Sequence, residues 1–306
     1  MCITIYEDNI SLNEIKLIKG KISLGLCCIN NSLNELKKEN RIYCNRTMIR
    51  KNFSVEKAKE YALKNVQDIS KLIEWNEKHN IKHLRLSSDM FPHYTDEVTE
   101  KYTLDFAKDE LKKAGKLAKK YGHRITFHPG QFCVVGARDQ NIFEKTIKDL
   151  EMHADILDIM EIDMDGILCI HGGGIYGDKQ SAINRWYDNF QRLPEKIKRR
   201  LCIENCEHSY NIKDCLEISK RCNIPVILDS HHYDCYNILH PDDQVDNITN
   251  YMDDIIKSWG DRTPLFHISE QNHSKRIGAH SDYCEHIPRY MLEVPIKYNK
   301  CISIEV

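Results

Sequence analysis

Short apolar runs that end in a histidine or a carboxylate recur along the chain, and they constrain its fold more than any other feature. The residues that end these runs are His128, His171, Glu204, Asp229, His267 and Glu305. The runs are continuously apolar, as expected of parallel strands that are covered on both faces. If these strands line one barrel, their carboxyl ends meet at one face, so the six side chains are expected to converge there.

Eight strand candidates alternate with helix-like segments over the 306 residues. Strands are expected at 22–28, 83–87, 124–128, 167–171, 201–205, 226–229, 265–269 and 302–306, and helices at 55–79, 104–121, 143–160, 181–198, 212–222, 247–259 and 287–298. This alternation predicts one (β/α)8 TIM barrel with its site at the C-terminal face of the strands. We expect an N-terminal extension over 1–20, with a helix at 12–18, and the barrel domain over 21–306.

Composition and charge narrow the class of protein. Hydrophobic residues make up 41% and charged residues 29% of the chain, and no apolar stretch approaches the roughly 18–20 residues of a membrane span. The N-terminus lacks the pattern of a signal peptide and the 13 cysteines include no Cys-x-x-Cys pair, so we expect an intracellular protein with reduced thiols. The net charge of −2 means that any contact with nucleic acid must come from a local basic surface.

The strand-end residues, together with His232 and His280 in adjoining loops, predict a metal centre. A single strand-end histidine is more often a hydrogen-bonded core residue, and Asp229 alone could cap a helix, but the conjunction favours metal binding. Eight candidate ligands are too many for one ion, so we expect two or three ions with Glu204 as the bridging carboxylate. Imidazole and carboxylate ligands suit manganese, zinc or iron.

Clustered divalent ions lower the pKa of a bound water and clamp the two oxygens of an in-line displacement at phosphorus. Phosphodiester hydrolysis is the reaction that most needs both effects. The same ions could instead shift a hydride or a proton within a sugar, so the ligand pattern alone leaves the reaction open.

A series of motifs, in order along the chain, resembles the UV damage endonuclease family. It comprises segments 24–30, 65–76, 85–92, 128–132, 171–174, 204–205, 228–232, 278–283 and 304–305, among them His128-Pro129-Gly130-Gln131-Phe132 and His171-Gly172-Gly173-Gly174. The resemblance implies a TIM-barrel endonuclease, similar in fold to endonuclease IV, that nicks double-stranded DNA 5′ to UV photoproducts and abasic sites. Manganese would be the metal, with zinc or iron as alternatives.

The resemblance also implies roles for particular residues. The expected ligands are His128, His171, Glu204, Asp229, His232, His267, His280 and Glu305, with Glu204, Glu305 and His232 in catalytic roles. Strand 2 should add a ligand soon after Pro92, and His93 and Asp96 are the two candidates. Gln131 and Phe132 would probe the damage by wedging into the duplex, although loop packing is the plainer explanation of Phe132.

The expected barrel assigns each basic segment to one face of the molecule. The cluster within 37–51 follows strand 1 and would lie at the catalytic face, whereas 196–200 precedes strand 5 and is expected to be a solvated helix end. The residues expected to contact DNA are Asn30, Arg46, Arg138, Lys275 and Arg276, in addition to Gln131 and Phe132.

Three other functions compete with that of a lesion endonuclease. They are an abasic-site endonuclease without photoproduct preference, a metal-dependent sugar isomerase or epimerase, and a catalytically silent lesion binder. The basic loop at 37–51 counts against the sugar enzyme, and the intact ligand positions count against the silent binder. We expect the protein to act as a monomer on damaged double-stranded DNA.

Overall fold

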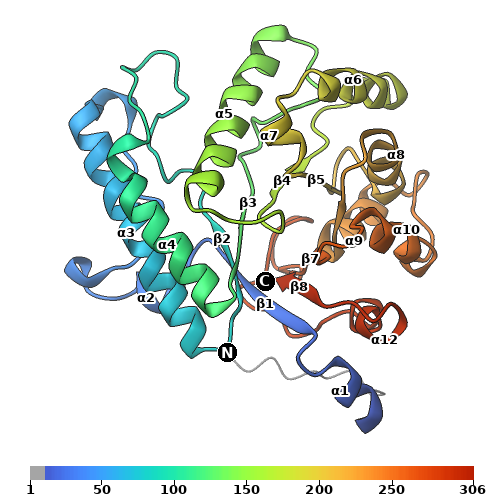
Figure 1. The fold of residues 1–306 in the computed structure, drawn as a ribbon. Coiled ribbons are helices and arrows are strands. Elements are labelled where there is room, and N and C mark those ends of the chain that lie inside the picture. The colour runs from blue at the N-terminus through green and yellow to red at the C-terminus, as the bar shows by residue number, and fades with distance from the viewer. Residues whose placement is uncertain (1–10) are drawn as a thin grey trace.

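Parallel strands form the centre of the molecule. The computed structural model describes residues 11–306, and within them eight strands close into a barrel in the order β1 to β8 (Figure 1). They are β1 (Ile22–Cys27), β2 (His83–Leu86), β3 (Arg124–Phe127), β4 (Leu168–His171), β5 (Leu201–Glu204), β6 (Val226–Asp229), β7 (Leu265–His267) and β8 (Ile302–Glu305). The predicted (β/α)8 barrel is confirmed, and each strand ends within two residues of its expected range.

Helices lie around the outside of the barrel (Figure 1). They are α1 (Leu12–Ile18), α2 (Asn31–Asn34), α3 (Val55–Lys78), α4 (Lys108–Tyr121), α5 (Gln140–Ile159), α6 (Lys179–Gln191), α7 (Glu195–Lys198), α8 (Ile212–Cys222), α9 (Ser230–Leu239), α10 (Met252–Ser258), α11 (Arg289–Leu292) and α12 (Val294–Lys297). Short 3-10 turns occur at Lys38–Asn40, Arg50–Asn52, Asp105–Ala107 and Ile248–Asn250. The helix expected at 12–18 is present as α1, whereas residues 1–10 lie outside the described part, and the division at residue 20 stays a prediction.

Several helix predictions are wrong in detail. The helix expected over 287–298 is divided into α11 and α12 at Glu293, and the helix expected over 247–259 consists of a 3-10 turn followed by α10. The single helix expected over 181–198 is divided into α6 and α7, because Pro194 has no backbone N–H and disfavours helical geometry in the residue before it. Helix α9 has no counterpart among the predicted helices. It begins directly after β6, where the carboxylate of Asp229 accepts the backbone N–H of His232 at 2.9 Å and caps the first turn.

The inner face of the barrel carries an apolar layer beneath the predicted site. Ile167, Cys169, Cys202, Ile227 and Leu265 form a separate buried cluster with Trp259. Four of them stand two positions before a site residue; Cys169 precedes His171, and Cys202 precedes Glu204. Because strand side chains alternate between faces, the same inner face carries these apolar side chains and, one layer nearer the carboxyl ends, the polar ones.

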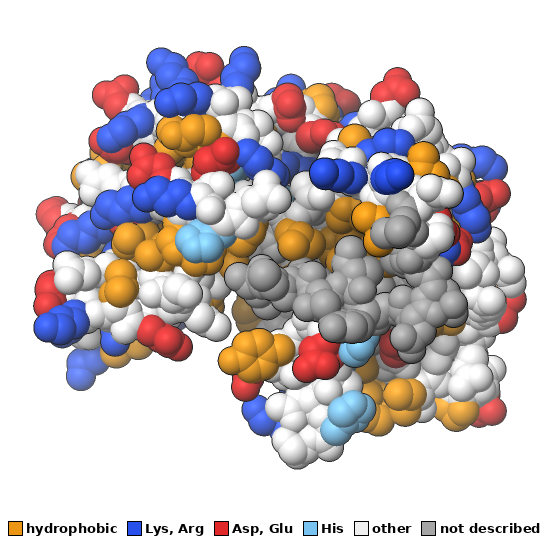
Figure 2. Space-filling model, turned by 90° about the horizontal axis from the view of Figure 1, so that it is seen from below, with side chains coloured by type: hydrophobic (Ala, Val, Ile, Leu, Met, Phe, Trp, Pro, Cys, Tyr) orange, Lys and Arg blue, Asp and Glu red, His pale blue; other side chains and the backbone are white. Residues whose placement is uncertain are grey.

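The outer surface carries charges of both signs. On the face shown in Figure 2, basic and acidic side chains are interspersed, in keeping with the net charge of −2. Among residues 11–306, no helix combines the length and the apolar character that crossing a membrane requires.

Candidate metal centre

A cavity of about 360 Å³ opens at the carboxyl ends of the strands. Seven of the eight expected ligands line it, namely His128, Glu204, Asp229, His232, His267, His280 and Glu305. The eighth, His171, ends β4 and places its Nε2 atom 3.5 Å from Glu204 Oε2. The structure therefore brings together side chains from the ends of six strands, as the strand-end pattern predicts. His280 comes from a loop, as expected, but His232 lies in the first turn of helix α9 and not in a loop.

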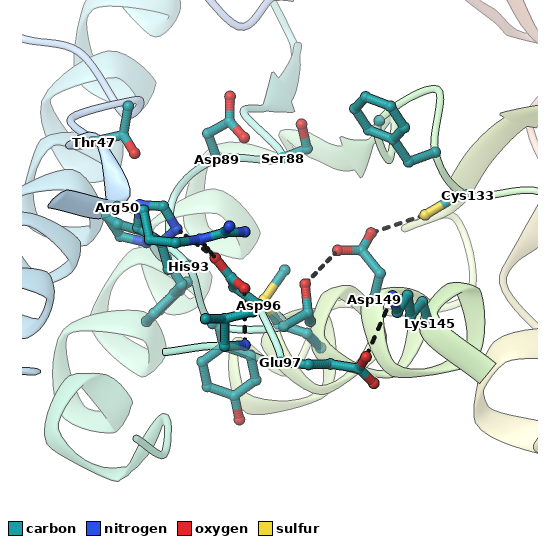
Figure 3. A pocket seen from close by; sticks show the side chains of 18 residues that line it. Thr47, Arg50, Ser88, Asp89, His93, Asp96, Glu97, Cys133, Lys145 and Asp149 are labelled. Carbon is teal, nitrogen blue, oxygen red and sulfur yellow. Dashed lines mark hydrogen bonds and ion pairs between the residues drawn. The ribbon is translucent and has the colours of Figure 1, made fainter. Parts of the chain in front are cut away.

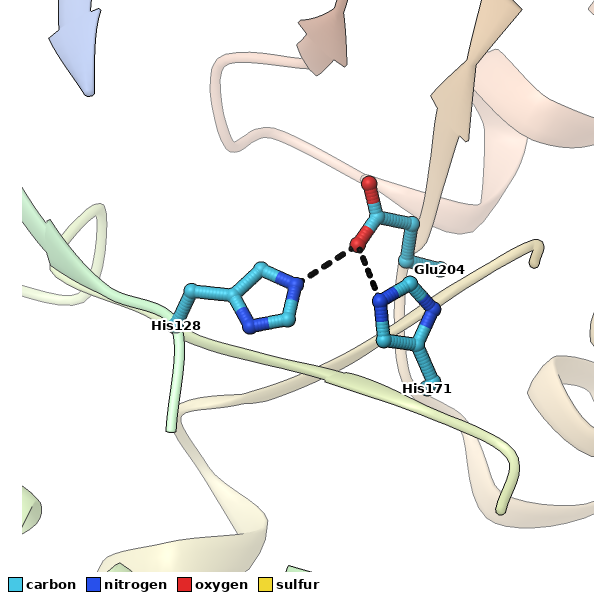
Figure 4. Close-up of side chains that lie close together, drawn as sticks. All are labelled: His128, His171 and Glu204. Carbon is cyan, nitrogen blue, oxygen red and sulfur yellow. Dashed lines mark hydrogen bonds and ion pairs between the residues drawn. The ribbon is translucent and has the colours of Figure 1, made fainter. Parts of the chain in front are cut away.

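Glu204 lies at the centre of this arrangement (Figure 4). Its Oε2 atom is 2.8 Å from His128 Nε2, and its Oε1 atom is hydrogen-bonded to His267 Nδ1. Burial by itself would raise the pKa of this carboxyl, but the neighbouring His267 and His171 rings hold the pKa well below its usual range. An ionised carboxylate is thus fixed among imidazoles at the bottom of the cavity.

His267 joins the two buried carboxylates. Its Nε2 atom lies 2.8 Å from Glu305 Oε2, while its Nδ1 atom bonds Glu204. Burial opposes a charge on this ring, but the two carboxylates outweigh it and raise the pKa of His267 to about 10. In contrast, burial lowers the pKa of His171 to about 4, so that ring is neutral and ready to act as a ligand.

Asp229 and His232 form the other side of the site. The Nδ1 atom of His232 lies 3.0 Å from the carbonyl oxygen of Asn205 and 3.5 Å from Asp229 Oδ2. The side chain of Asn205 is bonded to both backbone groups of Asp229, at 2.9 and 3.0 Å, and this fixes the end of β5 against the end of β6. The ring of His280 lies 6.4 Å from that of His232, measured between centroids.

The donor set fits divalent cations. Among the described residues, three groups place one donor atom per residue within 4.8 Å of the others: His128 with His171 and Glu204, Cys169 with Glu204 and His267, and Glu204 with Asp229 and His232. Glu204 belongs to all three groups, which is the position expected of a bridging carboxylate. Positive imidazole charge now neutralises the carboxylates, and cations could take over that role.

Strand β2 contributes residues that sequence reasoning missed. The buried ring of His83 lies 2.9 Å from Glu305 Oε1, and the guanidinium of Arg85 lies 3.1 Å from Glu305 Oε2. Thr126 on β3 donates a hydrogen bond of 3.0 Å to the same carboxylate. The available signal was the spacing of His83 and Arg85, which two-residue alternation places on one face of the strand.

Gly25 on β1 makes room for this group. A Cβ atom at Gly25 would lie 3.0 Å from His83 Nδ1 and 3.1 Å from Glu305 Cγ. The glycine thus allows the histidine and the carboxylate to pack against the β1 backbone.

The two candidates for a strand-2 ligand lie in a neighbouring pocket of about 500 Å³ (Figure 3). Asp96 Oδ2 is bonded to Arg50 Nε at 2.9 Å and to His93 Nδ1 at 3.1 Å. The other ring nitrogen of His93 is bonded to the carbonyl oxygen of Met48 at 2.7 Å. Both side chains are engaged by other groups, and neither lines the cavity that holds the predicted ligands.

The residues expected to contact DNA differ in their freedom to do so. Phe132 is 83% exposed, and Gln131, Arg138, Lys275 and Arg276 are exposed as well. Arg138 bonds the carbonyl oxygen of Tyr176 at 2.9 Å. Lys275 and Arg276 form no ion pair within residues 11–306.

Two of the expected contact residues are engaged inside the protein. Asn30 is buried and caps α2 through its side-chain oxygen. Arg46 forms an ion pair of 2.6 Å with Asp68 and lies over the ring of Tyr43.

The prediction that the basic segment at 196–200 is a solvated helix end is wrong for Arg200. Arg200 is buried, and its guanidinium bonds Asp158 at 2.7 Å and the carbonyl oxygens of Ile162, Asp163 and Gly166. The run of like charges in the sequence did not distinguish Arg200, which is buried and holds backbone carbonyl groups in place, from its more exposed neighbours.

Known proteins share both the sequence and the fold. The chain matches the model of UV-endonuclease UvdE over residues 22–300. A protein of Acanthamoeba polyphaga mimivirus is 33% identical over 292 residues, which cover 92% of this chain and 86% of that protein. The UV DNA damage endonuclease of Clostridium perfringens is 34% identical over 278 residues, which cover 85% of this chain and 66% of that protein.

Two solved structures are similar to this chain in fold. The crystal structure of SacUVDE superposes with a TM-score of 0.79 at 28% identity and covers 93% of this chain and 92% of that one. D-psicose 3-epimerase from Clostridium cellulolyticum H10 shares the barrel alone, with a TM-score of 0.51 at 14% identity over 78% of this chain and 79% of its own. Since the family match extends over nearly the whole chain, the chain belongs to the UV-endonuclease UvdE family.

Proposed function

We propose that the protein is a DNA repair endonuclease that nicks double-stranded DNA 5′ to UV photoproducts and at abasic sites. One observation carries the proposal: in a chain of this family, seven of the eight ligand-type side chains line one cavity and the eighth, His171, lies 3.5 Å from Glu204, while the exposed ring of Phe132 is in the loop that follows His128. The relatives named as UV-damage endonucleases support the substrate class.

The metal centre would hold two or three divalent ions, and we expect manganese, with zinc or iron as alternatives. The ligands would be His128, His171, Glu204, Asp229, His232, His267, His280 and Glu305. Such ions supply an activated water and stabilise the charge that develops on the leaving oxygen. Glu204 would bridge, because it belongs to all three donor groups. His83 and Arg85 hold Glu305 in place from β2.

The rim explains how a protein of net charge −2 could bind DNA. Arg138, Lys275 and Arg276 lie exposed in loops that follow β3 and β7, so they could meet phosphates at the catalytic face. Gln131 and Phe132 lie in the loop after β3, three and four residues beyond His128, and an exposed ring there could take the place of bases that leave the stack. Asn30 and Arg46 would act indirectly, by holding the β1 loop in shape.

A nicking assay on UV-irradiated plasmid tests the proposal. With manganese, the wild-type protein should convert supercoiled plasmid to the nicked form, and Glu204→Gln should abolish the conversion with a smaller effect on binding of lesion DNA. Absence of nicking with manganese, zinc and iron would overturn the proposal. Turnover of the Glu204→Gln variant at the wild-type rate would overturn the bridging role.

Defined duplexes separate the proposal from the nearest alternative. We expect cleavage of a duplex with a cyclobutane dimer and of one with an abasic site, each on its 5′ side. Cleavage of the abasic duplex alone would identify an abasic-site endonuclease without photoproduct preference.

A further inference from the structure

A thiol lies directly beneath the carboxylate of Glu204. Cys169 Sγ on β4 donates a hydrogen bond of 3.3 Å to Glu204 Oε2 on β5. Cys169, Glu204 and His267 are all buried, with exposed fractions of 1%, 1% and 6%. One donor atom of each lies within 4.8 Å of the other two. Sulfur, oxygen and nitrogen donors therefore meet at one point, on the inner side of the centre described above.

The spacing of the sulfur and oxygen donors suits a small tetrahedral cation. Zinc binds sulfur at about 2.3 Å and nitrogen or oxygen at about 2.0–2.2 Å, so two ligands of one tetrahedral ion lie roughly 3.4–3.6 Å apart. The distance of 3.3 Å between Cys169 Sγ and Glu204 Oε2 is already close to that value. Glu204 and His267 also line the cavity, so an ion could enter from there and keep one position open towards it.

We propose that Cys169, Glu204 and His267 form a site for a thiophilic divalent cation, zinc or cadmium, within the metal centre of the proposed nuclease. Soft thiolate ligands select such ions over manganese, which prefers oxygen donors. Binding breaks the S–H bond of Cys169 and the N–H bond of His267 that now points at Glu204. Both protons leave to water, bonds from sulfur and nitrogen to the ion form, and no oxidation state changes.

The register of the barrel supplies a matched control. Cys202 on β5 is paired with Cys169 on β4 and is equally buried, but the contact of its sulfur atom is with the carbonyl oxygen of Arg200 at 4.0 Å. Cys27 on β1 is a second comparison, because its sulfur atom lies 3.5 Å from Glu305 rather than Glu204. Each of the three variants removes one thiol, so a difference between them reports where the thiol lies and not how many thiols the protein has.

X-ray absorption at the zinc edge measures the sulfur ligand directly. The sample is the whole chain, freed of metal by a chelator and then given one equivalent of zinc. Wild type and Cys202→Ala should show a zinc–sulfur shell at about 2.3 Å, and Cys169→Ala should lack it. Cadmium titration should show one equivalent fewer of thiolate-to-metal absorption in Cys169→Ala. Circular dichroism checks that each variant is folded.

Two results would overturn the site. The first is that folded Cys169→Ala still shows a zinc–sulfur shell of wild-type size. The second is that Cys27→Ala loses the zinc–sulfur shell while Cys169→Ala keeps it. A Cys169→Ala variant that does not fold would leave the wild-type spectrum to decide, since a shell of nitrogen and oxygen alone contradicts the proposal. The measurement uses no DNA, so its failure is distinguishable from a failure of the nicking assay.

Discussion

The charged ring of His267 makes the stability of the metal-free protein depend on pH. Burial disfavours its protonation, but Glu204 and Glu305 on either side raise its pKa from 6.5 to about 10. A histidine whose pKa is raised in the folded state contributes stability that is complete below its unfolded pKa of 6.5. That contribution is lost as the pH rises through the folded pKa of about 10.

The size of the effect follows from the shift. From 6.5 to about 10 is a rise of about 3.5 pKa units, and at about 1.36 kcal/mol per unit this corresponds to about 5 kcal/mol. Since whole domains are stable by about 5–15 kcal/mol, the free energy of unfolding of the metal-free protein should fall measurably as the pH rises from 7 to 10. Bound cations would replace the proton and remove the dependence.

Guanidinium unfolding of chelator-treated protein between pH 6 and pH 10 measures this loss, and His267→Gln should show a much flatter profile. The nitrogen NMR signals of the His267 ring report its protonation in the folded wild type directly. A ring that titrates near 6.5, or a free energy of unfolding that does not fall between pH 7 and pH 10, would show that Glu204 and Glu305 do not hold a proton on His267.

Three further changes test other parts of the site. Phe132→Ala should lower kcat/KM on lesion DNA by about 5- to 150-fold, the value of one stacking contact, while the melting temperature stays unchanged because the ring is 83% exposed. Gly25→Ala should cost about 1–3 kcal/mol in chemical denaturation, because its Cβ would press on the ring of His83 at 3.0 Å. Arg85→Gln should weaken manganese binding in calorimetry by about 10- to 100-fold, because Arg85 orients Glu305.

Local pattern was sufficient to predict the barrel and most of the site. Continuous apolar runs identified all eight strands among the described residues, since parallel strands need apolar side chains on both faces. The barrel topology then required that residues such as His128 and Glu204, at the ends of different strands, meet at one face. The break between α6 and α7 at Pro194 was also readable in the sequence, but helical periodicity on both sides concealed it.

The contribution of strand β2 was decided by tertiary structure. The sequence pointed to His93 and Asp96, whereas the residues that reach the centre are His83 and Arg85. They face Glu305, which is more than 200 positions away in the chain, because closure of the barrel places β1 between β2 and β8. No local pattern encodes which inward-facing residues of distant strands share a layer.

The fold class and the kinds of candidate ligand were readable along the chain, because both depend on the alternation of strands and helices and on the residues that end the strands. The protonation of these ligands depends instead on the folded arrangement. The tertiary structure placed His267 between two carboxylates, left His171 neutral, and set a thiol beneath Glu204. The physical reason is that pKa values and metal preference depend on distances and burial, which the register between strands fixes after the chain has folded.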